Sequence, residues 1–165
     1  MTIKTSLTSI LLFLAAALSA SAHCQVPCGI YGDELKFGEL EQHVETISKS
    51  ARLIRELSAK KDLTAQDHQQ LVRWVNNKES HAQKIIDEAA NYFLAQRIKP
   101  DQEQYKDKLE LLHHIIVYSM KSKQSSGAEA PETLGKKIAK FKALYLDDDH
   151  DQHVTVHHGQ GGHSH

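Results

Sequence analysis

The sequence predicts an all-α protein: an up-down-up-down four-helix bundle with an N-terminal metal-binding hook and a disordered histidine-rich C-terminal tail. Four segments carry apolar residues at steps of three and four, the spacing of one face of an α-helix. No segment of useful length alternates between apolar and polar residues, as a half-buried strand would. Only three prolines occur, and each lies where a helix is expected to be absent or to begin. Four amphipathic helices with short connections favour a bundle.

The first two helices can be placed by their start signals and their apolar residues. The first is expected over about residues 33–60. The second is expected over about residues 64–96, because Thr64 and Asp67 have the spacing of a capping box. The core-facing residues expected on these helices are Phe37, Leu40, Val44, Ile47, Ala51 and Ile54, followed by Leu71, Trp74, Val75, Ile85, Ala89, Tyr92 and Phe93.

The last two helices complete the bundle, which we assign to residues 32–146. The third follows Pro100, and the fourth opens at Pro131 after a loop rich in Ser and Gly. The core-facing residues expected on them are Tyr105, Leu109, Leu112, Ile116 and Met120, followed by Leu134, Ile138, Phe141 and Tyr145.

Composition and charge exclude some partners. The formal net charge is -1 at pH 7, with 40% hydrophobic and 25% charged residues, which is a globular balance. Such a small charge creates no field that would attract nucleic acid or an anionic membrane, so neither is an expected partner.

Histidine is the unusual residue, with twelve in the chain, and six of them lie in the tail at residues 147–165. This tail has too little apolar content to fold. Two interpretations of it stay open: a solvated disordered end, or a segment that binds nickel, copper or zinc weakly through flexible imidazoles.

Residues 1–22 have the pattern of a secretory signal peptide. Lys4 provides a short basic start, residues 10–18 are an apolar run, and Ala20-Ser21-Ala22 is a cleavage signature. The apolar run is too short for a helix that spans a membrane. We therefore expect signal peptidase to cleave after Ala22, and the mature chain, with no membrane segment, to be exported to a periplasm or out of the cell.

After this cleavage, residues 23–31 would form a compact set of metal donors. His23 would gain a free α-amine beside its imidazole, and Cys24 and Cys28 add two thiols. A disulfide is the usual state of two cysteines in an exported chain, but one closing so short a loop would stabilise little. The amine and the Cys24 backbone nitrogen can join both sulfurs in one plane, with the imidazole on the axis. Such a planar set of nitrogen and sulfur donors favours nickel or copper over zinc.

Three neighbouring residues suit such a hook. Pro27 fixes φ and removes a backbone donor before the second cysteine. Gly29 permits a positive φ directly after it. Tyr31 can place a phenol over an open face of the metal, where a small anion would arrive.

The pattern H-C-x-x-P-C-G-x-Y at a processed N-terminus, followed by a helical body, resembles nickel-containing superoxide dismutase. The resemblance extends more weakly to about residue 146, and it includes Lys78-Glu79 and Asn91-Tyr92-Phe93. It implies an oxidoreductase that converts superoxide to oxygen and hydrogen peroxide by cycling between Ni(II) and Ni(III). It also implies one nickel ion per subunit and assembly as a homohexamer.

The resemblance also implies the roles of individual residues. The nickel ligands would be the amine and imidazole of His23, the amide nitrogen and sulfur of Cys24, and the sulfur of Cys28. Tyr31 would be the catalytic residue that gates or positions superoxide. Glu39 matches the carboxylate that hydrogen-bonds the axial imidazole and fixes its orientation.

Two positions depart from the pattern of the family, and several histidines have no assigned role. Gln25 stands where many members have aspartate, and His81 stands where some have arginine. His43 and His68 have no partner of ligand type four residues along the helix. The adjacent pair His113-His114 would point about 100° apart on a helix, so it is expected at the surface or in an interface.

Two other functions stay open. The chain could be an exported nickel or copper carrier that binds the ion through the hook and the histidine-rich tail. It could also be a structural helical bundle with a disulfide between Cys24 and Cys28. Redox turnover would distinguish an enzyme from a carrier, and the mass of the mature chain would reveal a disulfide.

Overall fold

The computed structural model describes residues 33–157, and within this range it contains helices and no strand. Helix α2 spans Glu34–Ser58 and α3 spans Ala65–Asp87, which is continued by the π-helix η1 over Glu88–Arg97. Helix α4 spans Tyr105–Gln124 and α5 spans Glu129–His157. The expected all-α fold is confirmed. The hook at residues 23–31, like the expected signal peptide, lies outside the described residues.

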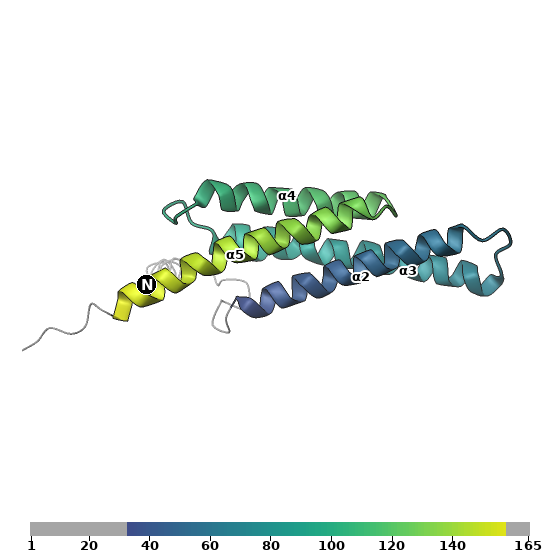
Figure 1. Cartoon of the computed structure of the whole chain (residues 1–165), viewed down its shortest axis with the longest axis horizontal. Helices are drawn as coiled ribbons and strands as arrows, with labels where there is room; N and C mark the ends of the chain where they lie inside the picture. The colour runs from purple at the N-terminus through teal and green to yellow at the C-terminus, as the bar shows by residue number, and fades with distance from the viewer. Residues whose placement is uncertain (1–32, 158–165) are drawn as a thin grey trace, which may run out of the picture.

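The helices form an up-down-up-down bundle, in which each helix runs back beside the one before it (Figure 1). Helix α2 packs against α3 and α5, and α4 packs against the same two helices. The two hairpins are offset along the bundle. The α2–α3 connection projects beyond the α4–α5 connection at one end, and α5 runs past the other helices at the opposite end (Figure 1). In the described part of the chain, none of the helices has the length and apolarity needed to cross a membrane.

Hydrogen bonds from side chains satisfy backbone groups at two of the helix ends. The Thr64 side chain accepts a hydrogen bond from the backbone N–H of Asp67, and the Asp67 carboxylate accepts one from the Thr64 N–H, so the predicted capping box is confirmed. At the end of α4, the buried Lys78 ammonium from α3 donates to the backbone carbonyls of Ser122, at 2.7 Å, and Lys123. A cation is favoured at this position because the last carbonyls of a helix carry partial negative charge.

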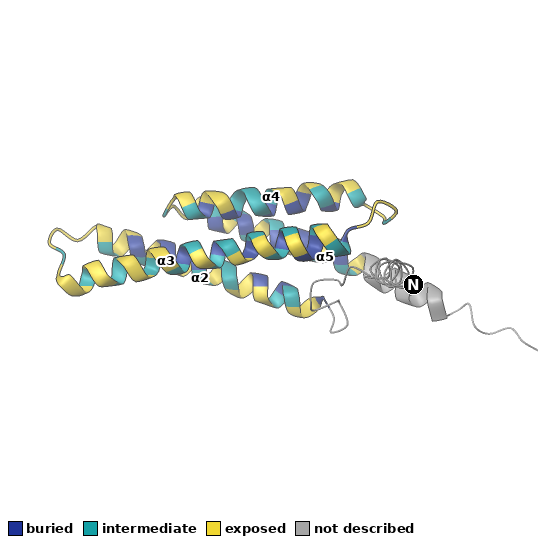
Figure 2. Ribbon diagram, turned by 180° about the vertical axis from the view of Figure 1, so that it is seen from behind, coloured by how far each residue is buried: buried dark blue, intermediate teal, exposed yellow. Residues whose placement is uncertain are grey.

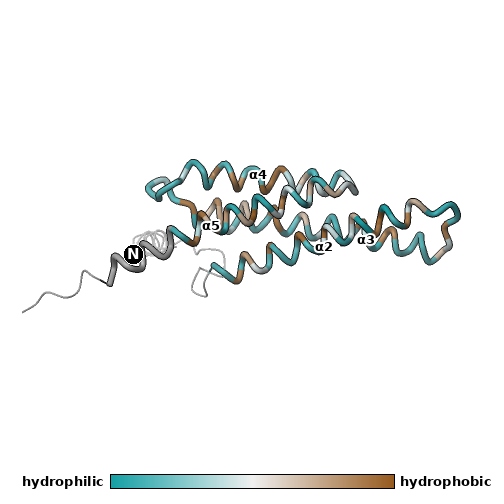
Figure 3. Tube along the Cα trace, in the orientation of Figure 1, coloured by the Kyte–Doolittle hydropathy of each residue, from teal (hydrophilic) through white to brown (hydrophobic). Residues whose placement is uncertain are grey.

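The core lies along the axis of the bundle. Buried residues recur along all four helices (Figure 2), and hydrophobic residues recur at intervals along the same helices (Figure 3). Four of its members form an aromatic cluster with ring centres 5.0 to 5.7 Å apart: Phe37, Phe93, Phe141 and Tyr145. The predicted stripe of the last helix is confirmed in full, because its four members are all at most 5% exposed: Leu134, Ile138, Phe141 and Tyr145.

The prediction for α4 was partly wrong. Met120 is 45% exposed, and Leu109 and Ile116 are only partly buried. The buried face instead follows a helical stripe that mixes apolar and polar residues: Lys108, Leu111, Leu112, Ile115, Ser119 and Ser122. An apolar pattern alone misses such a face, because the buried lysine and the two serines do not count toward it.

Val75 was also predicted to lie in the core, and this was wrong, since the residue is 39% exposed. The offset between the hairpins explains its exposure. The first half of α3 lies on the part of the α2–α3 hairpin that projects beyond α4 and α5 (Figure 1), so only one helix covers it. The nearby Val72 is 62% exposed for the same reason.

Two helices differ in extent from the prediction. The second predicted helix, at about residues 64–96, is an α-helix only to Asp87 and continues as η1. Helix α5 extends to His157, which is eleven residues into the segment predicted to be unfolded. Once a helix is formed, each added residue gains a backbone hydrogen bond at little cost, so a stable helix can propagate into polar sequence.

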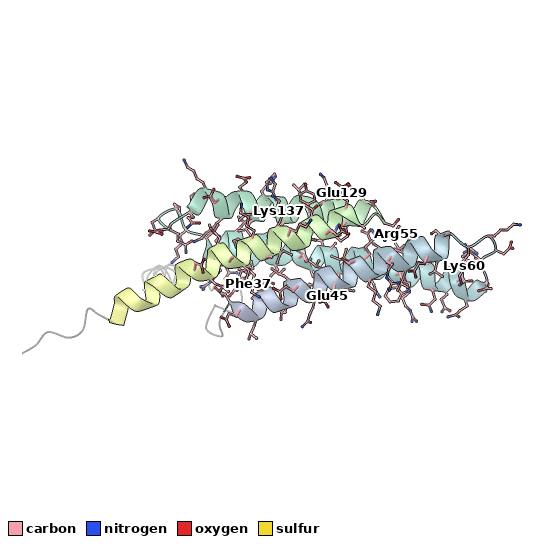
Figure 4. The ribbon with its side chains drawn as sticks, in the orientation of Figure 1. Phe37, Glu45, Arg55, Lys60, Glu129 and Lys137 are labelled. Atoms are coloured by element: carbon pink, nitrogen blue, oxygen red, sulfur yellow. The ribbon has the colours of Figure 1, made fainter. Side chains whose placement is uncertain are left out.

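We expect Phe37→Ala to lower the free energy of unfolding by about 3–5 kcal/mol, because it would leave a cavity among three aromatic rings. Phe37, labelled in Figure 4, lies near the start of α2 and is fully buried. Urea denaturation followed by circular dichroism would measure the loss. Leu35→Ala is the matched control, since Leu35 is 66% exposed and its truncation should cost less than about 0.5 kcal/mol. Equal losses in the two variants would contradict this assignment of the core.

Candidate functional site

The predicted site residues fall into two groups. His23, Cys24, Pro27, Cys28, Gly29 and Tyr31 lie outside the described residues, so their roles stay predictions. Glu39 lies on α2 with its side chain 58% exposed. What the structure does describe is the end of the bundle where the chain leaves the predicted hook, beginning at Asp33, two residues after Tyr31.

Asp33 is the first described residue, and its carboxylate is buried with its side chain 1% exposed. Arg97 donates to the Oδ2 atom through Nε at 2.9 Å and through a terminal nitrogen at 2.6 Å. The Tyr145 hydroxyl also donates to Oδ2, and the Tyr92 hydroxyl donates to Oδ1. These partners come from η1 and α5, so one carboxylate joins the start of α2 to two other segments of the bundle.

The position of Asp33 makes this arrangement unusual. Asp33 is the N-cap of α2, and its backbone carbonyl accepts hydrogen bonds from the N–H groups of Lys36 and Phe37. An aspartate at an N-cap usually turns its carboxylate to the free backbone N–H groups of the first turn. Here the side chain makes no such bond. Its carboxylate points into the bundle, where the buried hydroxyls and the guanidinium satisfy it.

The π-helix explains how Tyr92 and Arg97 reach the same carboxylate. The two residues are five apart, a spacing that would put them about 140° apart around an α-helix. A π-helix instead makes hydrogen bonds between residues five apart, as between the Ile98 N–H and the Phe93 carbonyl at 3.0 Å. The wider turn brings the fifth residue back to the same side, so both side chains converge on Asp33.

The hydrogen-bonded network lowers the pKa of Asp33 and accompanies raised pKa values of Tyr92 and Tyr145. Burial alone would raise the pKa of the Asp33 carboxyl, but hydrogen bonds from Tyr145, Tyr92 and Arg97 outweigh burial and hold this pKa below its ordinary value. Burial, followed by the hydrogen bond to the Asp33 carboxylate, raises the pKa of both Tyr92 and Tyr145 well above the usual range. The carboxylate is therefore ionised and the phenols are protonated across the physiological pH range.

Glu39 lies six residues after Asp33 on α2, and Lys36 links it to this network. The Lys36 ammonium is 3.2 Å from the Glu39 carboxylate and 3.1 Å from the Glu88 carboxylate, and it lies 5.4 Å from the centre of the Tyr92 ring. Burial lowers the pKa of Lys36, but the hydrogen bonds to Glu88 and Glu39 outweigh it, so the net shift is upward. Lys36 thus stays charged and restrains a carboxylate that remains open to solvent.

Sequence reasoning missed the anchoring role of Asp33, Arg97 and Tyr145. Tyr92 and Tyr145 were expected only to pack, and no role was expected for Arg97. The one available signal was the presence of two core-facing tyrosines, whose buried hydroxyls need partners. His81 also has a partner that the sequence did not reveal, because its Nδ1 atom lies 3.1 Å from the Nδ1 atom of His43 on the facing helix.

We expect Asp33→Asn to lower the free energy of unfolding at neutral pH by about 3–5 kcal/mol, because it leaves the Arg97 guanidinium without its charged partner. The pKa of Asp33 is lower in the folded chain than its value of 3.8 in the unfolded chain. Its stabilisation is therefore present above pH 3.8 and is lost as the pH falls through the folded value. Urea denaturation at several pH values should show the gap between the two proteins narrowing below pH 4.

Glu45→Gln is the control for this prediction, since it removes the same charge from an exposed position on α2 (Figure 4). It should change the stability by less than about 0.5 kcal/mol at any of these pH values. A constant gap between wild type and Asp33→Asn down to pH 2 would contradict the proposed ionisation of Asp33.

The comparisons with known proteins agree with the resemblance in the sequence. The family model for nickel-containing superoxide dismutase matches residues 18–149, which extend from before the predicted hook into α5. Neither the curated proteins nor the solved structures gave a match. The match confirms the expected enzyme class, an oxidoreductase that acts on superoxide, and the expected nickel cofactor. The chain therefore belongs to the nickel-containing superoxide dismutase family.

Proposed function

We propose that the chain is cleaved after Ala22 and that the new N-terminus at His23 holds the nickel ion. The ligands would be the His23 amine and imidazole, the Cys24 amide nitrogen and sulfur, and the Cys28 sulfur. The observation that carries this proposal is a coincidence in the sequence: a cleavage signature ends directly before the pattern H-C-x-x-P-C-G-x-Y. Cleavage at that point creates the amine that the ligand set needs.

The donor chemistry of the hook fits nickel. Thiolates together with nitrogen donors in a plane suit this ion, whereas zinc favours a tetrahedral set. The described residues provide no competing cage, because no three of their His, Cys, Asp or Glu side chains are placed to hold a metal ion. When bound, nickel would supply one-electron redox chemistry between Ni(II) and Ni(III), through which two superoxide ions become oxygen and hydrogen peroxide.

The described residues would fix the C-terminal end of the hook and would offer a carboxylate to it. Asp33 fixes the main chain two residues after Tyr31, so the Tyr31 phenol would be carried on a segment with one fixed end. Glu39, restrained by Lys36, presents an exposed carboxylate that could accept a hydrogen bond from the His23 imidazole. Such a partner would fix the orientation of the ring.

Processing and assembly complete the proposal. Signal peptidase would produce the mature chain, which would be exported to a periplasm or out of the cell. The mature chains would assemble as homohexamers with one nickel ion per subunit. An exported nickel or copper carrier is the alternative. A rhombic Ni(III) paramagnetic signal together with consumption of superoxide would support the enzyme, and tight nickel binding without turnover would support the carrier.

We expect one extra residue before His23 to abolish superoxide consumption, because the amine would no longer be available at the histidine. Purified mature protein with and without the extra residue would be compared by stopped-flow measurement of superoxide decay. The control is an insertion of one residue at Gly127, in the loop between α4 and α5, which should leave turnover unchanged. Full activity in the N-terminally extended protein would rule out the amine as a ligand.

We expect deletion of residues 147–165 to leave the turnover per bound nickel unchanged, because the truncated chain keeps Tyr145 and its hydrogen bonds to the Asp33 network. Metal analysis would measure the nickel content, and activity would be expressed per nickel ion. Nickel loading could become slower if the tail histidines deliver the ion. Loss of activity in fully loaded truncated protein would show that the tail takes part in turnover.

A further inference from the structure

Two half-buried histidines meet across the interface between α2 and α3, at a place that the proposed mechanism does not use. The Nδ1 atoms of His43 and His81 are 3.1 Å apart. The ring centres are 4.8 Å apart, and the ring planes are nearly perpendicular at 88°. Neither histidine could be assigned from the sequence, because the two lie on different helices and 38 positions apart.

The distances match those of two imidazoles that share one metal ion. Bonds from zinc to histidine nitrogens are about 2.0–2.1 Å long, so two such nitrogens lie roughly 2.9–3.4 Å apart for angles of about 90–109° at the metal. The same geometry puts the ring centres about 4.6–5.3 Å apart, if each nitrogen is about 1.2 Å from its ring centre. Two rings aligned head-on in a hydrogen bond of 3.1 Å would have centres about 5.5 Å apart. The rings of His43 and His81 are therefore inclined toward one another, a geometry that suits a bent hydrogen bond and also a metal ion held by both rings.

The charge state of the pair suits metal binding. Burial, followed by the nearby His81 and Lys84 charges, lowers the pKa of His43 and outweighs the opposing effect of Glu39. Burial and then Lys84 lower the pKa of His81. Both rings are therefore neutral near pH 7, which is the form that binds metals. The proton that one Nδ1 carries in the hydrogen-bonded pair can move to Nε2 of the same ring, so an ion can replace it without net loss of a proton.

The His43 side of the pair borders open space with room for the other ligands of such an ion. His43 borders an open hollow of about 250 Å³, which Glu39, Lys84, Asp87 and Glu88 also line. No third His, Cys, Asp or Glu within the described range is placed to complete a cage. The remaining ligands would therefore be water molecules, and the nearby carboxylates would hydrogen-bond to them, as outer partners of metal ligands commonly do.

We propose that His43 and His81 form a second metal site, a two-histidine clamp that binds one divalent cation of the zinc, nickel and copper class through both Nδ1 atoms. Imidazole is a good ligand for each of these ions. Binding would bridge α2 and α3 at the rim of the hollow that Glu39 also lines. The clamp uses none of the residues that we propose to hold the nickel of the hook.

Zinc binding to the mature, nickel-loaded protein tests the clamp. The wild type would be compared with His43→Gln, with His81→Gln, and with a control in which both His113 and His114 are changed to Gln. The control removes histidines that also lie close together, with ring centres 6.0 Å apart, but on one helix. After dialysis against Zn²⁺, each clamp variant should hold about one zinc ion fewer than wild type, and the control should hold the same number. Equal zinc contents in all four proteins would overturn the proposal.

A measurement on the wild type makes the test independent of how well the variants fold. In nuclear magnetic resonance of the histidine rings, zinc should shift the Nδ1 signals of His43 and His81 together. Shifts confined to the tail histidines would overturn the proposal. Superoxide turnover of the nickel-loaded wild type is measured separately, so failure of the clamp and failure of the proposed enzyme site are distinguishable.

Discussion

The Asp33 carboxylate, buried at the N-cap of α2, constrains the end of the bundle where α2 begins. Burying a charge is costly unless it is paired and hydrogen-bonded, so Asp33 requires Arg97, Tyr92 and Tyr145 to be in place. These partners are 64, 59 and 112 positions away in the sequence, respectively. The network can therefore form only when the first helix, the π-helix and the last helix have come together. The segment that we propose to carry the nickel ligands is thus attached to a point that exists only in the folded bundle.

The π-helix holds the partners of Asp33 in place, and Lys36 connects these residues to Glu39. An α-helix over residues 88–97 would turn either Tyr92 or Arg97 away from Asp33, and a buried group would then lack a partner. Lys36 lies between the network and Glu39, because it contacts the Glu39 and Glu88 carboxylates and the Tyr92 ring. The same few residues therefore anchor the main chain and restrain the Glu39 carboxylate, which we propose as a hydrogen-bond partner of the His23 imidazole.

The sequence predicted the helices better than it predicted their contacts. Repeating apolar residues were sufficient to identify four helices and the full core stripe of α5, and the capping box located the start of α3. The same method failed where polar residues are buried, as Ser119 and Ser122 are in α4. For the site, the hook could be predicted because its donors are contiguous in the chain. The Asp33 network and the pair of His43 and His81 could not, because their members meet only through the packing of helices.

Because the two hairpins are offset, one end of the bundle is more densely packed than the other. Beside the Asp33 network, all four helices pack around aromatic rings. The opposite end of the α2–α3 hairpin is covered by a single neighbouring helix, and it exposes Val72 and Val75. Regions with few buried apolar contacts open locally at a fraction of the global free energy. We therefore expect amide hydrogens around residues 55–75 to exchange with solvent through local opening that leaves the Asp33 network intact.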